Sequence, residues 1–339
     1  MIAPLVWLTK TATAGDTQAR IGIAEQLGAT WQEFSIPTTY CTDQQVFDRL
    51  VVEGLIDRHH PLWPDVIIGR SVYIPYLRVI KRLSSDKSLL VAMRPPTRDL
   101  PIQASQAELD ATDIICSYPH HDNSRFPQTL LCPTVPNRVT PSVLLNEKEQ
   151  WLQRYAAAAS RGPIIGVCMG GHIGVEKRRL FSPALAAQFG EHLNQIAQHM
   201  GASIIATMSR RTPSENVAAW RSAVRVPCDV YSPETDPPPN PYFGLLAFAD
   251  YLVVTADSLS MCCETTATGK PVYIFCDDSI LEEGHQTMLD YLIEHGHARR
   301  FCDRQSLEPF AYKPHNSAND IANAIRRCLV KHPKVLIKH

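Results

Sequence analysis

One segment in the second half of the chain combines hydroxyl and acidic residues at a spacing suited to phosphate binding. Residues 251–255 form an apolar, β-branched run, which is typical of a buried parallel strand. Residues 258–268 are predicted to form the next helix, with Asp257 and Ser258 at its start and Glu264 inside it. A helix N-terminus carries unpaired N–H groups and partial positive charge, so it suits a phosphate, and Glu264 would face a ribose. Alternatively, Asp257 or Ser258 only caps the helix.

Glycine, lysine and proline close this predicted helix. Gly269 has the position of a left-handed residue after a helix end, and Pro271 stops the helix. Lys270 lies where a cation interacts favourably with the negative end of the same helix. Residues 271–275 are predicted to form the next buried strand, so the segment is a β-loop-α-β unit.

Two other predicted strands in this half end in residues that suit a diphosphate. Gly170 and Gly171 follow one of them, although their surroundings do not read G-x-G-x-x-G, and Ser209, Arg210 and Arg211 follow the next. A glycine pair lets a ligand approach the backbone, and two arginines at a strand end can pair with a diphosphate. The alternatives are a simple turn and a solvated arginine pair. Together the three strand ends predict a nucleotide diphosphate site.

The first half has candidate catalytic and anion-binding positions of its own. Asp16 lies in a small polar loop after the first predicted strand, where it caps a helix or faces a substrate. Arg70 follows the third predicted strand, where it holds an anionic group or is solvated. His120, His121 and Asp122 follow the fifth. A carboxylate or imidazole at such a position can act as a general base, and a structural role is the alternative for each.

All these positions depend on strands that alternate with helices. Such alternation implies parallel sheets with right-handed crossovers, in which ligands sit at the carboxyl ends of strands. In the first half we predict strands at 5–9, 31–36, 65–69, 89–93, 113–117 and 130–132, and helices at 18–27 and 46–58. In the second half we predict strands at 164–168, 203–207, 229–231, 251–255 and 271–275, and helices at 151–160, 182–200, 216–223, 242–249, 258–268 and 319–330.

The length of the chain suggests more than one domain. Its 339 residues are too many for one ordinary core. We predict an N-terminal Rossmann-like domain over residues 1–140, a connector over 141–162, a C-terminal Rossmann-like domain over 163–315, and a final helix and tail over 316–339. Pro133, Pro136 and Pro141 mark the approach to the connector.

Composition excludes several classes of protein. Charged residues make up 20% of the chain and the net charge is −1, which gives no electrostatic basis for nucleic-acid binding. Ten cysteines without a C-x-x-C pair indicate reduced thiols in a cytosol rather than disulfides or a zinc site. No apolar run approaches the roughly 20 residues of a membrane span, and no signal-peptide pattern is present. We expect a cytoplasmic protein whose short basic tail allows at most peripheral contact with an inner membrane.

Several longer motifs resemble one known family. They are TMSRRTP at 207–213, NPYFG at 240–244, VTADS at 254–258, Ser260-Met261, Glu264, GKPVY at 269–273 and, in the first half, Gly15-Asp16-Thr17-Gln18 and Leu27-Gly28. They look like the family whose plant member is called the elongated-mitochondria fission factor and whose bacterial members are labelled glycosyltransferases. The resemblance covers most of the chain. It departs at 169–174 (MGGHIG), where a more polar glycine loop is expected, so His172 is not expected to contact phosphate.

This resemblance implies a GT-B-like α/β protein, with two Rossmann-like domains that face a cleft and contain parallel sheets. It implies a metal-independent glycosyltransferase without a cofactor, for which a nucleotide-activated sugar is the co-substrate. The sugar would move to a cell-envelope or other glycan or lipid-linked acceptor. The alternatives are a sugar-nucleotide epimerase or hydrolase on the same fold and a non-catalytic adaptor related to the fission factor.

The resemblance also distributes roles between the two predicted domains. The C-terminal domain would bind the donor through Gly170, Gly171, Ser209, Arg210, Arg211, Asp257, Ser258, Ser260, Met261 and Glu264, with no metal ligand. The N-terminal domain would receive the acceptor, with Asp16, His120 and Asp122 as catalytic candidates and with Thr13, Gln18 and Arg70 on the acceptor side.

Overall fold

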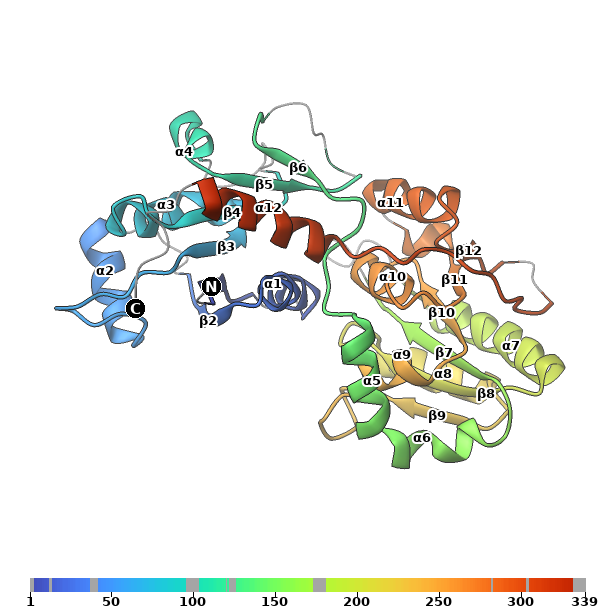
Figure 1. Cartoon of the computed structure of the whole chain (residues 1–339). Coiled ribbons are helices and arrows are strands. Elements are labelled where there is room, and N and C mark those ends of the chain that lie inside the picture. Colours follow the sequence, from blue (N-terminus) through green and yellow to red (C-terminus); the bar gives the residue numbers. More distant parts are fainter. Residues whose placement is uncertain are drawn as a thin grey trace. The chain divides into compact units, whose positions relative to one another are not determined.

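The computed structural model describes residues 3–11, 14–36, 42–95, 104–119, 121, 126–172, 181–281, 283–302 and 305–331. The chain divides into two compact units (Figure 1). The first unit contains the described residues up to Arg138 and those from Asn316 onward, and the second contains Val139–His315. Within the described residues, no helix is long and apolar enough to cross a bilayer, and no disulfide joins the nine described cysteines.

The last helix of the chain belongs to the first unit. Helix α12 (Ser317–Lys331) packs against α1 (Ala14–Leu27), far away in the sequence (Figure 1). Just before α12, the amide of Asn316 donates to the backbone carbonyl of Asn137 at 2.9 Å. Gly22 of α1 lets this segment approach, because a Cβ there would lie 2.3 Å from the Asn137 carbonyl oxygen. The first and last parts of the chain therefore share one unit.

The sheet of the first unit has six parallel strands in the order β2-β1-β3-β4-β5-β6. The order reverses between β1 and β3, which makes that point the usual ligand position of such a sheet. Its strands are β1 (Leu5–Thr9), β2 (Thr30–Phe34), β3 (Val66–Arg70), β4 (Leu89–Met93), β5 (Ile114–Ser117) and β6 (Thr129–Leu131). Besides α1 and α12, its helices are α2 (Asp43–Val52), α3 (Ile74–Leu83), α4 (Gln106–Asp110) and the short η1 (Ser71–Tyr73).

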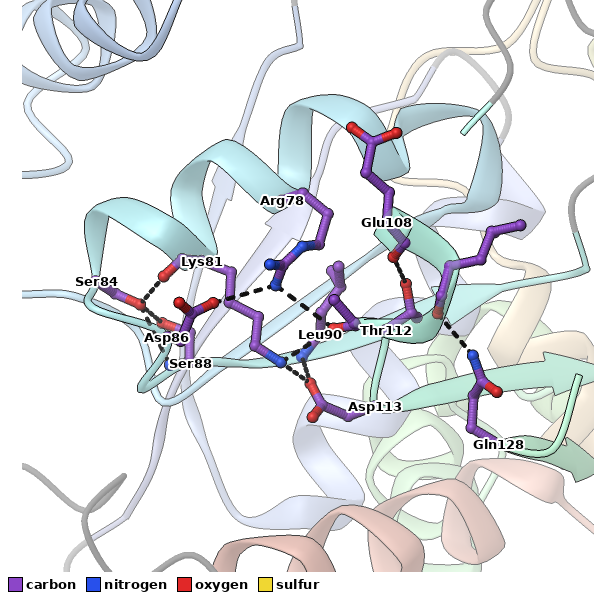
Figure 2. A network of polar contacts seen from close by, with 12 residues as sticks. Arg78, Lys81, Ser84, Asp86, Ser88, Leu90, Glu108, Thr112, Asp113 and Gln128 are labelled. Atoms are coloured by element: carbon purple, nitrogen blue, oxygen red, sulfur yellow. Dashed lines mark hydrogen bonds and ion pairs between the residues drawn. The ribbon is translucent and has the colours of Figure 1, made fainter. Parts of the chain in front are cut away.

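Polar side chains fix α3 to the amino ends of β4 and β5 (Figure 2). Lys81 of α3 donates to the carboxylate of Asp113 at 2.5 Å, and the same carboxylate accepts the backbone N–H of Leu90 at 2.6 Å. Arg78, one turn earlier, donates to the carboxylate of Asp86 at 3.3 Å. Each cation of this network faces a carboxylate of its own, which is the pattern of a structural contact.

The second unit has its own six-stranded parallel sheet, in the order β12-β11-β10-β7-β8-β9. This order reverses between β7 and β10. The strands are β7 (Ile164–Met169), β8 (Ser203–Met208), β9 (Cys228–Tyr231), β10 (Tyr251–Thr255), β11 (Val272–Phe275) and β12 (Arg299–Arg300). The helices are α5 (Pro141–Gln150), α6 (Leu152–Ala159), α7 (Pro183–Met200), α8 (Ser214–Ala223), α9 (Tyr242–Phe248), α10 (Leu259–Thr266), α11 (Glu283–Glu294) and the short η3 (Asp278–Ile280). The predicted parallel sheets are thus confirmed.

Several helices start at other residues than predicted, and two of these differences change the interpretation of a segment. Residues 141–150, predicted to be connector, form α5, whose first residue is Pro141. Proline is favourable there because a first-turn N–H has no partner within the helix. The side chain of Thr140 accepts the Val143 N–H at 3.1 Å and caps this helix. Helix α1 begins at Ala14 rather than at Gln18, so part of the predicted loop is helical.

Candidate functional site

A buried carboxylate joins three strand ends of the second unit. The side chain of Asp257, just after β10, has no exposed surface. It accepts the Gly171 N–H at 2.9 Å, the Arg211 guanidinium at 3.0 Å and the Thr255 hydroxyl at 2.6 Å. Burial raises the pKa of Asp257, while Arg211 and the hydrogen bonds act in the opposite direction. Asp257 is therefore a clasp between loops, and its interpretation as a helix cap is wrong.

The two glycines after β7 are explained by this clasp. A Cβ at Gly170 would lie 1.9 Å from a carboxylate oxygen of Asp257, and a Cβ at Gly171 would lie 1.9 Å from the carbonyl oxygen of Arg211. The hydroxyl of Thr212 also donates to the Gly170 carbonyl at 2.5 Å. The close approach expected from the glycine pair is real, but the approaching groups belong to the chain itself.

Two arginines follow β8. Arg211 donates to Asp257 and, at 3.0 Å, to the backbone carbonyl of His172. Both arginines are exposed to solvent, and 40% of the Arg211 side chain is exposed. Ser209 shapes the turn between them and β8, because its hydroxyl accepts the Arg211 N–H at 3.1 Å. Arg211 is therefore held by the chain itself, and the predicted pairing of both arginines with a diphosphate stays a prediction.

The start of α10 lacks a side-chain cap. Ser258 occupies the N-cap position, but its side chain makes no capping hydrogen bond, so the second capping interpretation is also wrong. The N–H groups of the first helical turn have no partner within the helix by its geometry. Ser258, Ser260 and Met261 are half-buried around this helix start. The glycines and Arg211 bond or pack within the chain, whereas the first N–H groups of α10 have no partner within the helix and no side-chain cap.

Glu264 is a buried carboxylate on the same helix. Its carboxyl group accepts a hydrogen bond from the hydroxyl of Tyr242, on α9, at 2.6 Å, and the residue is 5% exposed. Burial raises the pKa of Glu264 to about 7, although the hydrogen bond from Tyr242 opposes the shift. Glu264 therefore changes its charge near neutral pH.

Lys270 interacts with a helix end, but not with the predicted one. Gly269 has the expected left-handed conformation (φ +76°). The Lys270 ammonium donates to the carbonyls of Leu246, Ala247 and Ala249, at 2.8, 2.7 and 2.6 Å, at the end of α9. Burial lowers the pKa of Lys270 to about 8. The sequence correctly predicted a cation at a helix C-terminus, but only packing decided which helix.

A second cluster lines a cavity in the first unit. Asp16 and Arg20 lie one turn apart on α1, Arg70 ends β3, Arg94 follows β4 and Tyr118 follows β5. Arg94 donates to the carboxylate of Asp16 at 3.1 Å, and the Arg70 guanidinium lies 3.9 Å from it. Because α1 begins at Ala14, Asp16 is inside the first turn and is not a cap. The expected convergence of polar residues at strand ends thus occurs around Asp16 and Arg70.

Arg20 and Arg94 are members of this cluster that the sequence reasoning missed. Arg20 is 1% exposed, and Arg94 has a left-handed backbone (φ +73°) that is uncommon outside glycine. Two signals were present in the sequence. Arg20 is a charged residue within the apolar face of a predicted helix, and Arg94 directly follows a buried strand.

The other candidates of the first unit either are not among the residues that line the cavity or lie outside the described residues. The side chain of Gln18 accepts from the Arg138 guanidinium at 3.3 Å, which indicates a structural contact. The His121 ring accepts the Tyr118 N–H at 3.3 Å, and burial, with a smaller effect of Arg94, lowers its pKa to about 4. Thr13, His120 and Asp122 lie outside the described residues.

The fold and the position of both clusters define a class of protein. Two six-stranded parallel sheets, each with a polar cluster where its strand order reverses, form a GT-B-like fold. The UDP-GlcNAc 2-epimerase from Methanocaldococcus jannaschii is similar to this chain with a TM-score of 0.57 and 11% identity, covering 97% of this chain and 100% of that one. Os79 from O. sativa in complex with UDP is similar with a TM-score of 0.51 and 9% identity, covering 98% and 94%. At such identities the likeness shows the fold alone.

The chain belongs to the family described as Mitochondrial fission ELM1, whose model matches residues 14–329. RP120 of Rickettsia prowazekii (strain Madrid E) is 26% identical to this chain, covering 96% of it and 98% of its own length. Mitochondrial fission protein ELM1 of Arabidopsis thaliana is 40% identical over 94 residues, which are 26% of this chain and 21% of that protein. The family predicted from the sequence motifs is confirmed.

Proposed function

We propose that this protein is a metal-independent glycosyltransferase that binds a nucleotide-activated sugar in its second unit. The carrying observation is the uncapped start of α10, directly after β10 and beside the point where the strand order reverses. Parallel sheets of this type bind ligands at that point, and a helix N-terminus there favours phosphate. The likeness to a UDP-GlcNAc epimerase and to a UDP complex supports a nucleotide sugar as the ligand.

The environments of the donor-site residues assign them two kinds of role. The N–H groups of Ser260 and Met261 and the hydroxyl of Ser258 would bind the diphosphate. Arg210, which is exposed, would neutralise the charge that develops on the leaving phosphate. Arg211, Asp257, Gly170 and Gly171 would hold the neighbouring loops in place, since they already bond or pack against one another. Ser209 would shape the turn that carries Arg210.

Glu264 would accept hydrogen bonds from the ribose hydroxyls. It can do so best as a carboxylate, and its pKa of about 7 means that acidification protonates it. Nucleotide affinity should therefore decrease as the pH falls from about 8 to 6. In the Glu264→Gln variant this pH dependence should disappear for a nucleotide sugar, whose diphosphate does not titrate in this range.

The first unit would receive the acceptor, a glycan or a lipid-linked molecule of the cell envelope. Inverting transfer requires a general base at the acceptor hydroxyl. Asp16 is the carboxylate that lines the cavity at the carboxyl ends of these strands, and its side chain is 17% exposed. An acceptor hydroxyl would have to replace part of its contact with Arg94. This function would be carried out in the cytoplasm, with at most peripheral contact with a membrane.

Thermal stabilisation by nucleotides tests the donor site. UDP, GDP, ADP, TDP and CMP, each with its common sugar derivatives, should be compared. A ligand at about a hundred times its dissociation constant should add about 2.7 kcal/mol of stability. We expect a shift with one base, and a weaker shift in Arg210→Gln but not in Arg221→Gln, an exposed arginine of the same unit. If no nucleotide stabilises the protein, the proposal fails and the adaptor alternative replaces it.

Epimerisation is the second candidate, because a UDP-GlcNAc 2-epimerase shares the fold over 97% of this chain. Incubation with the stabilising nucleotide sugar in the absence of acceptor separates the two activities. An epimerase or hydrolase would convert the sugar or release nucleotide under these conditions. A transferase should require the acceptor.

A further inference from the structure

The cavity of the first unit carries more positive charge than its carboxylate balances. Three guanidinium groups, of Arg20, Arg70 and Arg94, line it together with the single carboxylate of Asp16. The half-buried Glu33 also acts on Arg20, but more weakly than Asp16. In the network at the other edge of the same sheet (Figure 2), each cation has a carboxylate of its own. The excess of cations around this cavity is therefore not shared by the network at the opposite edge.

Arg20 supplies an independent sign of a missing partner. It is 1% exposed, and its Nη2 atom donates to the Thr11 hydroxyl at 2.9 Å. Its Nε atom is buried without a hydrogen-bond partner among the described residues. Buried donors are almost always paired in folded proteins, and an arginine keeps its charge when buried. An anion in the cavity would provide the acceptor that Nε lacks.

The backbone of Arg94 also indicates a constrained position. Its left-handed conformation is unfavourable for an arginine, and such conformations persist where the surrounding structure enforces them, often at ligand sites. In this conformation the side chain reaches Asp16 across the end of the sheet. Arg94 is 42% exposed, so it remains accessible to an incoming group.

We propose that this cavity binds a small oxyanion, a phosphate or a carboxylate group, between Arg20, Arg70 and Arg94. Planar guanidinium groups bind both oxyanions with paired N–H donors. Asp16 is the internal competitor for Arg70 and Arg94, and a bound oxyanion would take over part of its contacts. This site lies in the first unit, whereas the proposed nucleotide site lies in the second. Where the proposed function holds, it follows that the acceptor carries a negative charge close to its reacting hydroxyl.

Calorimetric titration of the full chain with inorganic phosphate and with acetate tests this site, at constant ionic strength and with chloride as the background anion. Arg94→Gln should weaken binding of the preferred oxyanion about tenfold, the usual effect of losing a charge-assisted hydrogen bond. Arg82→Gln is the matched control, because Arg82 is also 42% exposed and pairs with one carboxylate, that of Asp43. It should change the affinity less than about twofold.

Asp16→Asn separates a binding role from a structural one. Removal of the competing carboxylate should strengthen oxyanion binding severalfold, whereas a purely structural cluster would only lose stability. Saturable binding of phosphate or of acetate identifies the group that the natural ligand carries. The proposal is overturned if neither oxyanion binds saturably, or if the Arg94 and Arg82 variants behave alike. Nucleotide stabilisation, measured on the same variants, should be unchanged, so failure of this site and failure of the nucleotide site are distinguishable.

Discussion

The two units each place an aspartate–arginine pair at the ligand edge of a parallel sheet, but the pairs differ in their surroundings. The Arg211–Asp257 distance is 3.0 Å and the Arg94–Asp16 distance is 3.1 Å. The Asp257 side chain has no exposed surface and accepts two further hydrogen bonds, from Gly171 and Thr255. Asp16 is 17% exposed, and a second arginine, Arg70, lies close to it.

This difference shows how the same pair of residue types serves two purposes. In the second unit the carboxylate is fully coordinated by the chain, so the pair fixes loops, and we propose that ligand binding falls to the nearby helix start. In the first unit three arginines line a cavity with one aspartate, and we propose that the remaining positive charge binds an oxyanion. Proximity of an arginine to an aspartate does not by itself indicate either purpose, and the balance of donors and acceptors around the pair does.

The largest effect on stability is expected from a side chain added at Gly171, against which the Arg211 backbone packs. In Gly171→Ala the added methyl group would overlap a backbone carbonyl that cannot rotate away, which should reduce the free energy of unfolding by about 3 kcal/mol or more. Chemical denaturation measures it. Gly284→Ala in α11 is the control, because a Cβ there has no heavy atom within 4 Å. If the two variants were equally stable, the Arg211 backbone would not pack as closely against Gly171 as the structure shows.

Glu264 adds to the comparison a buried carboxylate that bonds a tyrosine rather than an arginine. The pKa of Glu264 is about 7 in the folded protein, against an ordinary 4.5. Between pH 4.5 and 7 the unfolded chain has therefore released this proton, whereas the folded chain retains it. The stabilising contribution of the protonated group is present below about pH 4.5 and is lost as the pH rises through 7. Glu264→Gln should therefore be more stable than the wild type by about 3 kcal/mol at pH 8, with most of this difference absent at pH 5. Denaturation at both pH values tests this, with Glu294→Gln, an exposed substitution, as control.

Removal of the charge from Asp257 should have a smaller but clear effect. Asp257→Asn loses the charge-assisted bond to Arg211 and retains an oxygen for other donors, which should cost about 2 kcal/mol of unfolding free energy. Because Arg211 is 40% exposed, water replaces part of the lost interaction. A loss below about 0.5 kcal/mol would contradict the closed clasp.

The equivalent change in the first unit should have the smallest effect on stability. Asp16→Asn should cost about 1 kcal/mol, since Asp16 is partly exposed and the two arginines in ion-pair distance, Arg70 and Arg94, are about 40% exposed. Parallel denaturation of the two asparagine variants provides the measurement. If Asp16→Asn destabilises the protein as much as Asp257→Asn, the two pairs are equivalent and the comparison is wrong.

Much of the fold was predictable because the strands are continuous apolar runs. The predicted bounds of β1, β4 and β10 agree with the structure, and their alternation with helices correctly indicated parallel sheets. The helix in the first half of the connector was not predicted, because the prolines were interpreted as breaks, whereas the predicted helix at 151–160 agrees with α6. Pro141 instead starts α5, where its missing N–H has no consequence.

The sequence by itself determined that glycines, arginines and acidic residues follow the strands of two parallel sheets, and its motifs determined the family. These properties depend on residue order alone, since the ends of parallel strands necessarily share an edge. Only the tertiary structure decided which residues meet: that Lys270 caps α9, that Asp257 bonds Arg211, and that Arg20 and Arg94 join Asp16. The physical reason is that contacts between distant segments depend on packing, burial and hydrogen-bond geometry, none of which local spacing records.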